Sequence, residues 1–412
     1  MIVKFDSTLR ASVLAGVMVI SVLMLLGVLL FISLWYNELS LDFRFRELRK
    51  QQALLSSAFV RYGRDSCLRE CWEQDSSILL FPGDESSRVK YRCKQWGLYE
   101  LVEVTLPGEK CPAVRLMGKA AESRHRATVY IPDNDCALAL AGKCAVEGKA
   151  CISANGISYT QLRSEFYRGR SWGREKLSLS DREFPAADNL AQEWVDCLFA
   201  GAEEGDIRTI ESMNVPFTSP VQLLYAPAVT DGYRLGGHIL LYAGDKVFIG
   251  ADNEFSQILI VARKVVIEEG FRGSMQVFAR DTIVVGDGVF LGAGSGLWVE
   301  GHAADPLIYL GEQCELNAYV VVNGTVDRPA LKTAHYYQPG STVVRGLVYV
   351  DGVADVHGLV NGSLYVREPC YFAPEGYYSG LFYNLLVLRH SSVAYPFLLD
   401  GPYERRCVAW PD

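Results

Sequence analysis

Residues 258–291, ILIVARKVVIEEGFRGSMQVFARDTIVVGDGVFL, contain two near-copies of one pattern. In each copy, a run of aliphatic residues is followed by a short stretch rich in glycine and acidic residues. The first run begins at Ile258 and the second begins at Met275. A repeat this short cannot bury a core alone, so successive repeats must stack on one another.

The same step recurs further along the chain. A run that begins at Leu347 is followed by runs at Leu364 and Leu381, each separated from the last by the interval between Ile258 and Met275. Other steps are longer, as expected where loops are inserted at one corner of a coil. We therefore predict a mainly β fold with a C-terminal β-solenoid over residues 232–380, at about 17–18 residues per coil. The alternative is a β-sandwich or barrel, whose strands are usually longer and joined by hairpin turns.

Stacked coils require the same inward positions to carry apolar side chains. On this register Ile260, Val277 and Val348 point inward, and Glu269 lies on an exposed corner. Glycine, aspartate and asparagine suit the corners because they tolerate a positive φ.

A second segment indicates where the protein resides. Residues 11–35, ASVLAGVMVISVLMLLGVLLFISLW, carry no charge over 25 positions. At about 1.5 Å per residue, a helix of that length crosses a hydrocarbon core of roughly 30 Å. The apolar region of a signal peptide is shorter, and Trp35 and Tyr36 stand where an interfacial aromatic belt would lie. We predict a transmembrane helix over residues 11–35 that contacts membrane lipid.

The charges around this span favour a cytoplasmic N-terminus. Lys4 and Arg10 precede the span, whereas Glu38 and Asp42 follow it directly. A count of the basic residues further along points the other way, but long C-terminal domains translocate largely regardless of charge. We expect a single-pass protein of the bacterial cytoplasmic (inner) membrane, with the bulk of the chain on the periplasmic, extracytoplasmic side.

The remaining divisions follow from composition and periodicity. No glycine or proline occurs from Val28 to Tyr62, which favours one continuous helix that leaves the membrane as a stalk. Short strand-like runs follow, and then one solenoid-like coil that a helix at 187–200 interrupts. We expect a cytoplasmic head at 1–10, the transmembrane helix at 11–35, a stalk helix at 36–63, a small β-rich region at 64–135, a first solenoid-like coil with a helical insertion at 136–231, the β-solenoid at 232–380 and a C-terminal cap at 381–412.

The chain has 11 cysteines, which suits an oxidising compartment, and the odd number leaves at least one thiol free or paired between chains. Cys67 and Cys71 are close in sequence, and Cys144 and Cys151 could face each other on adjacent strands. No CxxC pair and no close Cys/His cluster occurs, so we predict no metal site. With a net charge of −8, the chain also lacks the basic composition typical of nucleic-acid-binding proteins.

Two classes of enzyme use solenoid folds. Residues 285–296 fit the repeat unit of hexapeptide acyltransferases, in which His302 or His357 would be the base, but the series does not persist. A polysaccharide lyase or hydrolase would need clustered carboxylates or basic groups on one face. The acidic candidates are Asp281, Asp287, Glu300 and Asp305. All six residues are better explained as corner or surface positions, so we predict no catalytic residue and no cofactor.

The repeat texture of residues 261–291 and of GLVYVDGVADVHGLVNGSLYV at 346–366 resembles bactofilin-type polymer-forming solenoids. The order of membrane helix, the coil LALAGKCAVEGKACIS at 138–153 and C-terminal solenoid looks like uncharacterised membrane-anchored proteins of Bacteroidota. The N-terminal helix is weakly similar to that of type IV pilins and pseudopilins, although it lacks their processed glycine and their early glutamate. These resemblances carry no catalytic motif, and they imply a scaffold or an assembly component.

We therefore expect a membrane-anchored structural protein that has protein partners or self-assembles. It would be a component of a cell-envelope assembly such as a pilus-like or secretion apparatus. The alternative is an extracytoplasmic β-solenoid that binds or cleaves carbohydrate. Aromatic residues along one groove beside paired carboxylates would favour the alternative, and a smooth apolar end or edge would favour assembly.

Overall fold

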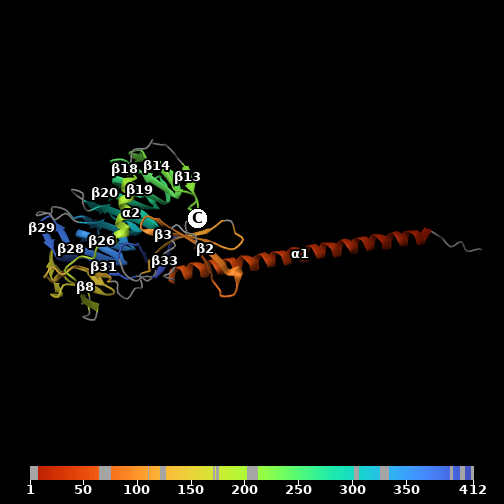
Figure 1. Cartoon of the computed structure of the whole chain (residues 1–412), viewed down its shortest axis with the longest axis horizontal. Helices are drawn as coiled ribbons and strands as arrows, with labels where there is room; N and C mark the ends of the chain where they lie inside the picture. Colours follow the sequence, from red (N-terminus) through yellow and green to blue (C-terminus); the bar gives the residue numbers. More distant parts are fainter. Residues whose placement is uncertain are drawn as a thin grey trace, which may run out of the picture.

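The computed structural model describes residues 8–64, 76–109, 111–120, 127–169, 172, 176–201, 212–300, 306–324, 334–389, 393–399 and 404–409. A long N-terminal helix leads into a head that consists mainly of β-strands (Figure 1). The predicted combination of a long apolar helix and a mainly β chain is therefore confirmed. Residues 1–7, most of the predicted cytoplasmic head, lie outside the described residues.

Helix α1 (Thr8–Arg64) is unbroken over 57 residues and projects away from the head in Figure 1. The predicted continuity of membrane segment and stalk is confirmed, because nothing between Val28 and Tyr62 interrupts the helical hydrogen bonds. The helix ends beside Gly63, where a Cβ atom would come within 2.8 Å of the Arg405 carbonyl oxygen. Only glycine permits this close approach.

A small antiparallel sheet follows the helix. Its strands are β1 (Ser76–Leu79), β2 (Arg88–Trp96), β3 (Tyr99–Thr105), β4 (Ala113–Ala120), β32 (Ala394–Tyr395) and β33 (Arg405–Ala409). A short 3₁₀ helix (Glu85–Ser87) lies between β1 and β2. Buried and exposed residues alternate along most of β2, as expected for a strand with one face in a core and one in water.

The rest of the head consists of strands that pair in parallel. The long strands β19 (Glu254–Ile267), β20 (Arg272–Val285), β21 (Phe290–Glu300), β23 (Glu315–Asn323), β26 (Leu347–Val356) and β28 (Ser363–Ala373) each take part in more than one ladder of pairings. We distinguish three ladders by the shorter strands that complete them.

The first ladder adds β13 (Ser212–Val215), β16 (Arg234–Gly237), β25 (Val343–Val344), β27 (Gly358–Asn361), β31 (Leu385–Leu388) and β7 (Ala145–Val146). The second adds β14 (Gln222–Tyr225), β17 (Ile239–Tyr242), β5 (Val129–Tyr130), β8 (Ala150–Ile152) and β12 (Leu177–Leu179). The third adds β15 (Val229–Thr230), β18 (Lys246–Ile249), β22 (Leu307–Leu310) and β24 (Tyr336–Gln338). A separate parallel sheet holds β30 (Leu381–Tyr383), β6 (Leu138–Ala141) and β9 (Ile157–Tyr159).

The remaining short strands of the described structure form hairpins. Strands β10 (Gln161–Leu162) and β11 (Glu165–Phe166) pair with each other, and β29 (Gly376–Ser379) forms an antiparallel hairpin with β28.

The apolar core lies between the ladders and agrees with the predicted inward positions. Ile260, Val277 and Val348 are all fully buried in one core cluster, and Ile260 pairs with Val277 at the predicted step. Glu269 is exposed in a turn, as predicted. The intervals between paired inward residues are longer further along the chain, such as that from Val320 to its partner Val348. The regular interval therefore holds for only some of the paired strands.

The predicted register is wrong at the C-terminal end. Val348 pairs with Leu364, one position short of the predicted step, and this pairing places Leu347 opposite Ser363. Val348 and Leu364 both belong to the core between the ladders, whereas Leu347 belongs to the cluster on the outer side of the second ladder. A one-residue shift exchanges the two faces of a strand, so side-chain direction and not the matching of leucines sets the register.

The order of strand pairing also differs from the prediction. Strand β28 pairs with β5 and not with residues 381–383, because the hairpin with β29 diverts the chain. The described strands of the segment predicted as a C-terminal cap divide between two sheets: β30 and β31 continue the parallel pairing, and β32 and β33 join the small sheet. The segment predicted as a first coil, 136–231, is divided between both ends of the stack. Because parts of this segment pair at both ends of the ladders, they cover strand edges that would otherwise remain open.

The outer side of the second ladder is buried as well. Helix α2 (Asn189–Ala200), close to the predicted 187–200, packs on it together with the small sheet. The Gln276 side chain, only 1% exposed, holds the hairpin between β2 and β3 in place. Its amide donates to the Trp96 carbonyl at 3.0 Å and accepts from the Leu98 N–H at 3.0 Å. The small sheet and the ladders are therefore joined by a dry, hydrogen-bonded contact.

Candidate functional site

The N-terminal part of α1 is an apolar surface that nothing in the described structure covers. Every large apolar side chain from Val13 to Tyr36 is more than half exposed. Burying one such side chain stabilises by about 1.5–3 kcal/mol, so a surface of this size requires an apolar environment. The helix is long and apolar enough to cross a membrane.

The C-terminal end of α1 is fixed to the head by apolar packing. Leu54, Ala58, Phe59 and Tyr62 lie in one buried cluster with residues of β2, β3 and β4. Their spacing places them on one face of the helix. The Tyr91 hydroxyl adds a hydrogen bond of 2.9 Å to the Ala58 carbonyl oxygen.

A buried polar network completes this junction between helix and head. Arg405 donates to both carboxylate oxygens of Glu100, from Nη2 at 2.9 Å and from Nε. The Tyr62 hydroxyl donates to Glu100 Oε2 at 2.9 Å and accepts from the Cys93 thiol at 2.9 Å. The side chains of Arg405 and Glu100 are only 2% and 5% exposed. Burial first, and then the Glu100 charge, raise the pKa of Tyr62 far above its usual value, so its hydroxyl stays protonated and able to donate.

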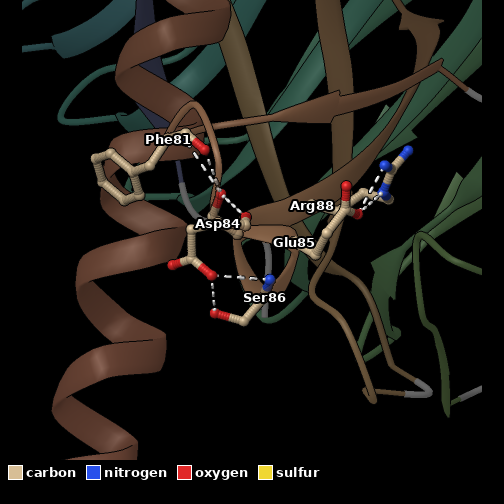
Figure 2. A network of polar contacts seen from close by, with 6 residues as sticks. Phe81, Asp84, Glu85, Ser86 and Arg88 are labelled. Atoms are coloured by element: carbon tan, nitrogen blue, oxygen red, sulfur yellow. Dashed lines mark hydrogen bonds and ion pairs between the residues drawn. The ribbon is translucent and has the colours of Figure 1, made fainter.

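The turn between β1 and β2 lies beside α1 and is tied to it (Figure 2). Arg61 of α1 donates to the Leu79 carbonyl oxygen at 3.0 Å. Within the turn, Asp84 Oδ1 accepts from the backbone N–H and the hydroxyl of Ser86, and these two hydrogen bonds lower the pKa of Asp84. Helix α1 is thus fixed both to the small sheet and to the connection between β1 and β2.

The three acidic candidates within the described residues, Asp281, Asp287 and Glu300, do not form a catalytic cluster. Asp281 accepts from Arg263 Nε at 2.7 Å, and Asp287 accepts from the Glu312 N–H at 2.7 Å. The ladder segment 282–285 separates them. Glu300 lies at the end of β21, opposite Asn323.

Two further candidates, His302 and Asp305, lie outside the described residues.

Among the sequence candidates that the structure describes, His357 is the one that lies in a buried polar pair. Its Nε2 lies 2.7 Å from Asp355 Oδ1, and its Nδ1 lies 2.7 Å from the Tyr383 carbonyl oxygen. A carbonyl oxygen and an ionised carboxylate both accept, so this arrangement favours a proton on each ring nitrogen. Burial opposes this charge, but the hydrogen bond and the charge of Asp355 outweigh burial and raise the pKa of His357.

With a proton on each nitrogen, the ring has no lone pair free to act as a base. The rings of Tyr337, Tyr371 and Tyr383 lie within 6.5 Å of the His357 ring and enclose the pair in aromatic contacts. The geometry thus fits a structural role. The sequence analysis missed Asp355, although its spacing of two from His357 places both residues on the same face of an extended chain.

Cys144 and Cys151, which the sequence suggested could face each other on adjacent strands, do not do so. Cys144 precedes β7 in the first ladder and Cys151 lies in β8 of the second, so the two are not on adjacent strands. Both thiols are free, and the Cys144 thiol donates to the Ala141 carbonyl oxygen at 3.2 Å.

Cys67 and Cys71 lie outside the described residues. Among the residues that the structure does describe, no group of three or more His, Cys, Asp or Glu could hold a metal ion.

Comparison with known protein families, with curated proteins and with solved structures found no match to this chain.

Proposed function

We propose that the protein is a membrane-anchored scaffold of the bacterial cell envelope, whose β head works through its surfaces. The observation that carries the proposal is the single helix α1. Its N-terminal part offers an apolar surface to lipid, and its C-terminal end is locked into the head by the Glu100–Arg405–Tyr62 network. A helix fixed in this way sets the position of the head relative to the membrane, because no flexible linker separates the helix from the head.

In this proposal the anchor spans the cytoplasmic membrane through residues 11–35. Lys4 and Arg10 stay in the cytoplasm, and the head lies on the periplasmic side. The head is a β-solenoid, similar in texture to bactofilins, in which the three ladders are successive sides of each coil. Its support is the parallel pairing of β19, β20 and β21, each of which continues from one ladder into another.

The stalk provides a surface for self-assembly. Leu34, Leu41, Leu48 and Leu55 recur every seven residues, and the first three are exposed on α1 while Leu55 contacts the head. Phe45 lies between them on the same face and is 60% exposed. A seven-residue apolar repeat favours a left-handed pairing of two helices. Because both copies are anchored in one membrane, the pair is parallel.

The test of this scaffold is the mass of the full chain in mild detergent. We expect an oligomer by sedimentation equilibrium, and we expect Leu41→Gln with Leu48→Gln to dissociate it at least 10-fold more readily. Phe43→Gln is the matched control, since Phe43 is 71% exposed but lies on the opposite side of the helix. A monomeric full chain, or equal effects of the two variants, would contradict self-assembly through the stalk.

A charge change sharpens the same test. In a parallel pair, Arg44 of one stalk and Arg49 of the other flank the apolar seam and repel each other. Arg49→Glu replaces this repulsion with attraction, so it should strengthen the association most at low salt. An unchanged or weaker association would exclude this register.

A further inference from the structure

A row of small and polar side chains runs along the outer side of the first ladder, across its strands. Asn214, Gly236, Ser256 and Ser274 are in register on β13, β16, β19 and β20. On β23, β25 and β27 the residues that follow the paired Leu316, Val344 and Val360 continue the row. We call this row the polar trough; its members are Asn214, Gly236, Ser256, Ser274, Asn317, Arg345 and Asn361.

The polar trough is hollowed at two places. A hollow of about 490 Å³ surrounds Asn214, Gly236 and Ser256, and one of about 350 Å³ surrounds Asn317, Arg345 and Asn361. Tyr99 and Val408 of the small sheet form one wall of the second hollow. Each volume lies in the range of ligand sites, which is about 300–1,000 Å³.

The two hollows adjoin at Gln257. This residue lines the first hollow, and its amide donates at 2.7 Å to the carbonyl oxygen of Ala293, which lines the second. Gly294 has a φ of +83°, and a Cβ atom there would come within 2.6 Å of Gln257 Oε1. Glycine at position 294 therefore leaves room for the Gln257 side chain at the boundary between the hollows.

Each hollow also contains an amide oxygen without a hydrogen-bond partner. Gln257 Oε1 and Asn361 Oδ1 are both shielded from water and unpaired. Unpaired buried oxygens of this kind cost about 1–3 kcal/mol and call for an explanation. A ligand hydroxyl that donates to each terminal amide, after a small rotation of that amide into the polar trough, would remove this cost.

Most of the charges beside the polar trough are paired. Arg234 lies 3.4 Å from Glu254, Arg345 is paired with Glu315, and Arg272, which lines the first hollow, stacks over the Phe290 ring at 5.2 Å. A single arginine without a carboxylate partner among the described residues does not favour a phosphate-rich ligand, which would need several unpaired cations. A peptide could not add a strand here, because the polar trough lies on the face of a sheet and not at its edge. Amides, hydroxyls and paired arginines offer donors and acceptors together, which suits a polyhydroxylated ligand.

We propose that the polar trough binds an extended, uncharged glycan chain that runs across the strands of the first ladder. At about 4.8 Å per strand, the row from β13 to β27 spans roughly 34 Å. Glycan binding is additional to anchoring and self-assembly, and it depends on neither of them.

The test is calorimetric titration of the full chain in detergent with three probes: a neutral hexasaccharide, a hexasaccharide of uronic acids and a polar twelve-residue peptide. We expect the neutral hexasaccharide to bind most tightly. Ser256→Tyr should weaken this binding at least 10-fold by filling the first hollow. Thr282→Tyr, on the outer side of the third ladder, is the matched control and should leave binding unchanged.

Asn361→Leu separates ligand binding from a structural role. Because it removes an unpaired oxygen, the melting temperature should stay equal or rise while hexasaccharide binding weakens several-fold. The proposal would be overturned if the peptide or the acidic hexasaccharide bound more tightly than the neutral hexasaccharide, or if the neutral one did not bind. It would also be overturned if Ser256→Tyr bound the neutral hexasaccharide as tightly as the wild type does. A fall in melting temperature with unaltered binding in Asn361→Leu would likewise overturn the role of Asn361.

Discussion

The parallel ladders and the helix–head junction stabilise the head by different means. In the ladders, an inward residue such as Val277 has an equivalent on the next strand, Leu297, and both are fully buried among apolar side chains. In the junction, Tyr62, Glu100 and Arg405 come from three distant parts of the chain and have no equivalents. The comparison shows that a repeated core can be found from its period, whereas a unique polar joint cannot.

The largest effect should come from a charge inside the ladders. Val277→Asp places a carboxylate without a partner in a fully buried site, which should cost about 4 kcal/mol or more of the free energy of unfolding. Glu269→Asp, in an exposed turn, should change it by no more than about 0.5 kcal/mol. Denaturant unfolding of the full chain in detergent measures both, and equal losses would refute the register of the core.

A somewhat smaller effect should come from the junction. Arg405→Met leaves the Glu100 carboxylate buried without its cation and should cost about 3–5 kcal/mol. Adding Glu100→Leu to Arg405→Met removes the unpaired buried carboxylate, so the double variant should be more stable than Arg405→Met alone.

Hydrogen exchange locates this effect. Amides of residues 54–62 should lose protection in Arg405→Met more than amides of β19 and β20 do. If the loss were uniform over the head, the junction would not be a separate joint.

The smallest effect should appear as a pH dependence. The pKa of His357 is raised in the folded state, so its ion pair with Asp355 stabilises the head fully below the unfolded value of 6.5. That contribution is lost as the pH rises through the higher folded pKa. His357→Asn should therefore cost about 1 kcal/mol at pH 5.5 and progressively less above pH 7.

The difference between wild type and variant is the quantity to measure. His238 is present in both proteins, and burial lowers its pKa, so its opposite contribution cancels in the difference. A difference that grows with pH would show that His357 is neutral in the head.

The sequence predicted the parts of the molecule that local rules determine. The absence of charge over residues 11–35 and of glycine and proline from Val28 to Tyr62 predicted one long helix, and apolar runs at a fixed step predicted the inward positions of Ile260 and Val277. The pairing of β28 with β5 could not be predicted, because it joins residues 364–365 to residues 129–130 and depends on where a hairpin diverts the chain.

The polar sites were harder to predict than the fold. Glu100 and Arg405 are 305 positions apart, so no local spacing connects them. His357 was found, but the sequence could not show that Asp355 and the Tyr383 carbonyl occupy both of its nitrogens. The outward row of the polar trough has no apolar period and becomes visible only when the strands are in register.

The most direct test of the account is the fractionation of cells that produce either the full chain or a chain without residues 1–36. We predict that the full chain stays in the membrane pellet after alkaline extraction. The shortened chain should remain in the supernatant without detergent, with the melting temperature of its head unchanged, because the junction at residues 54–62 is retained. A shortened chain that still sediments with membranes, or a full chain released by alkali, would contradict an anchor at residues 11–35.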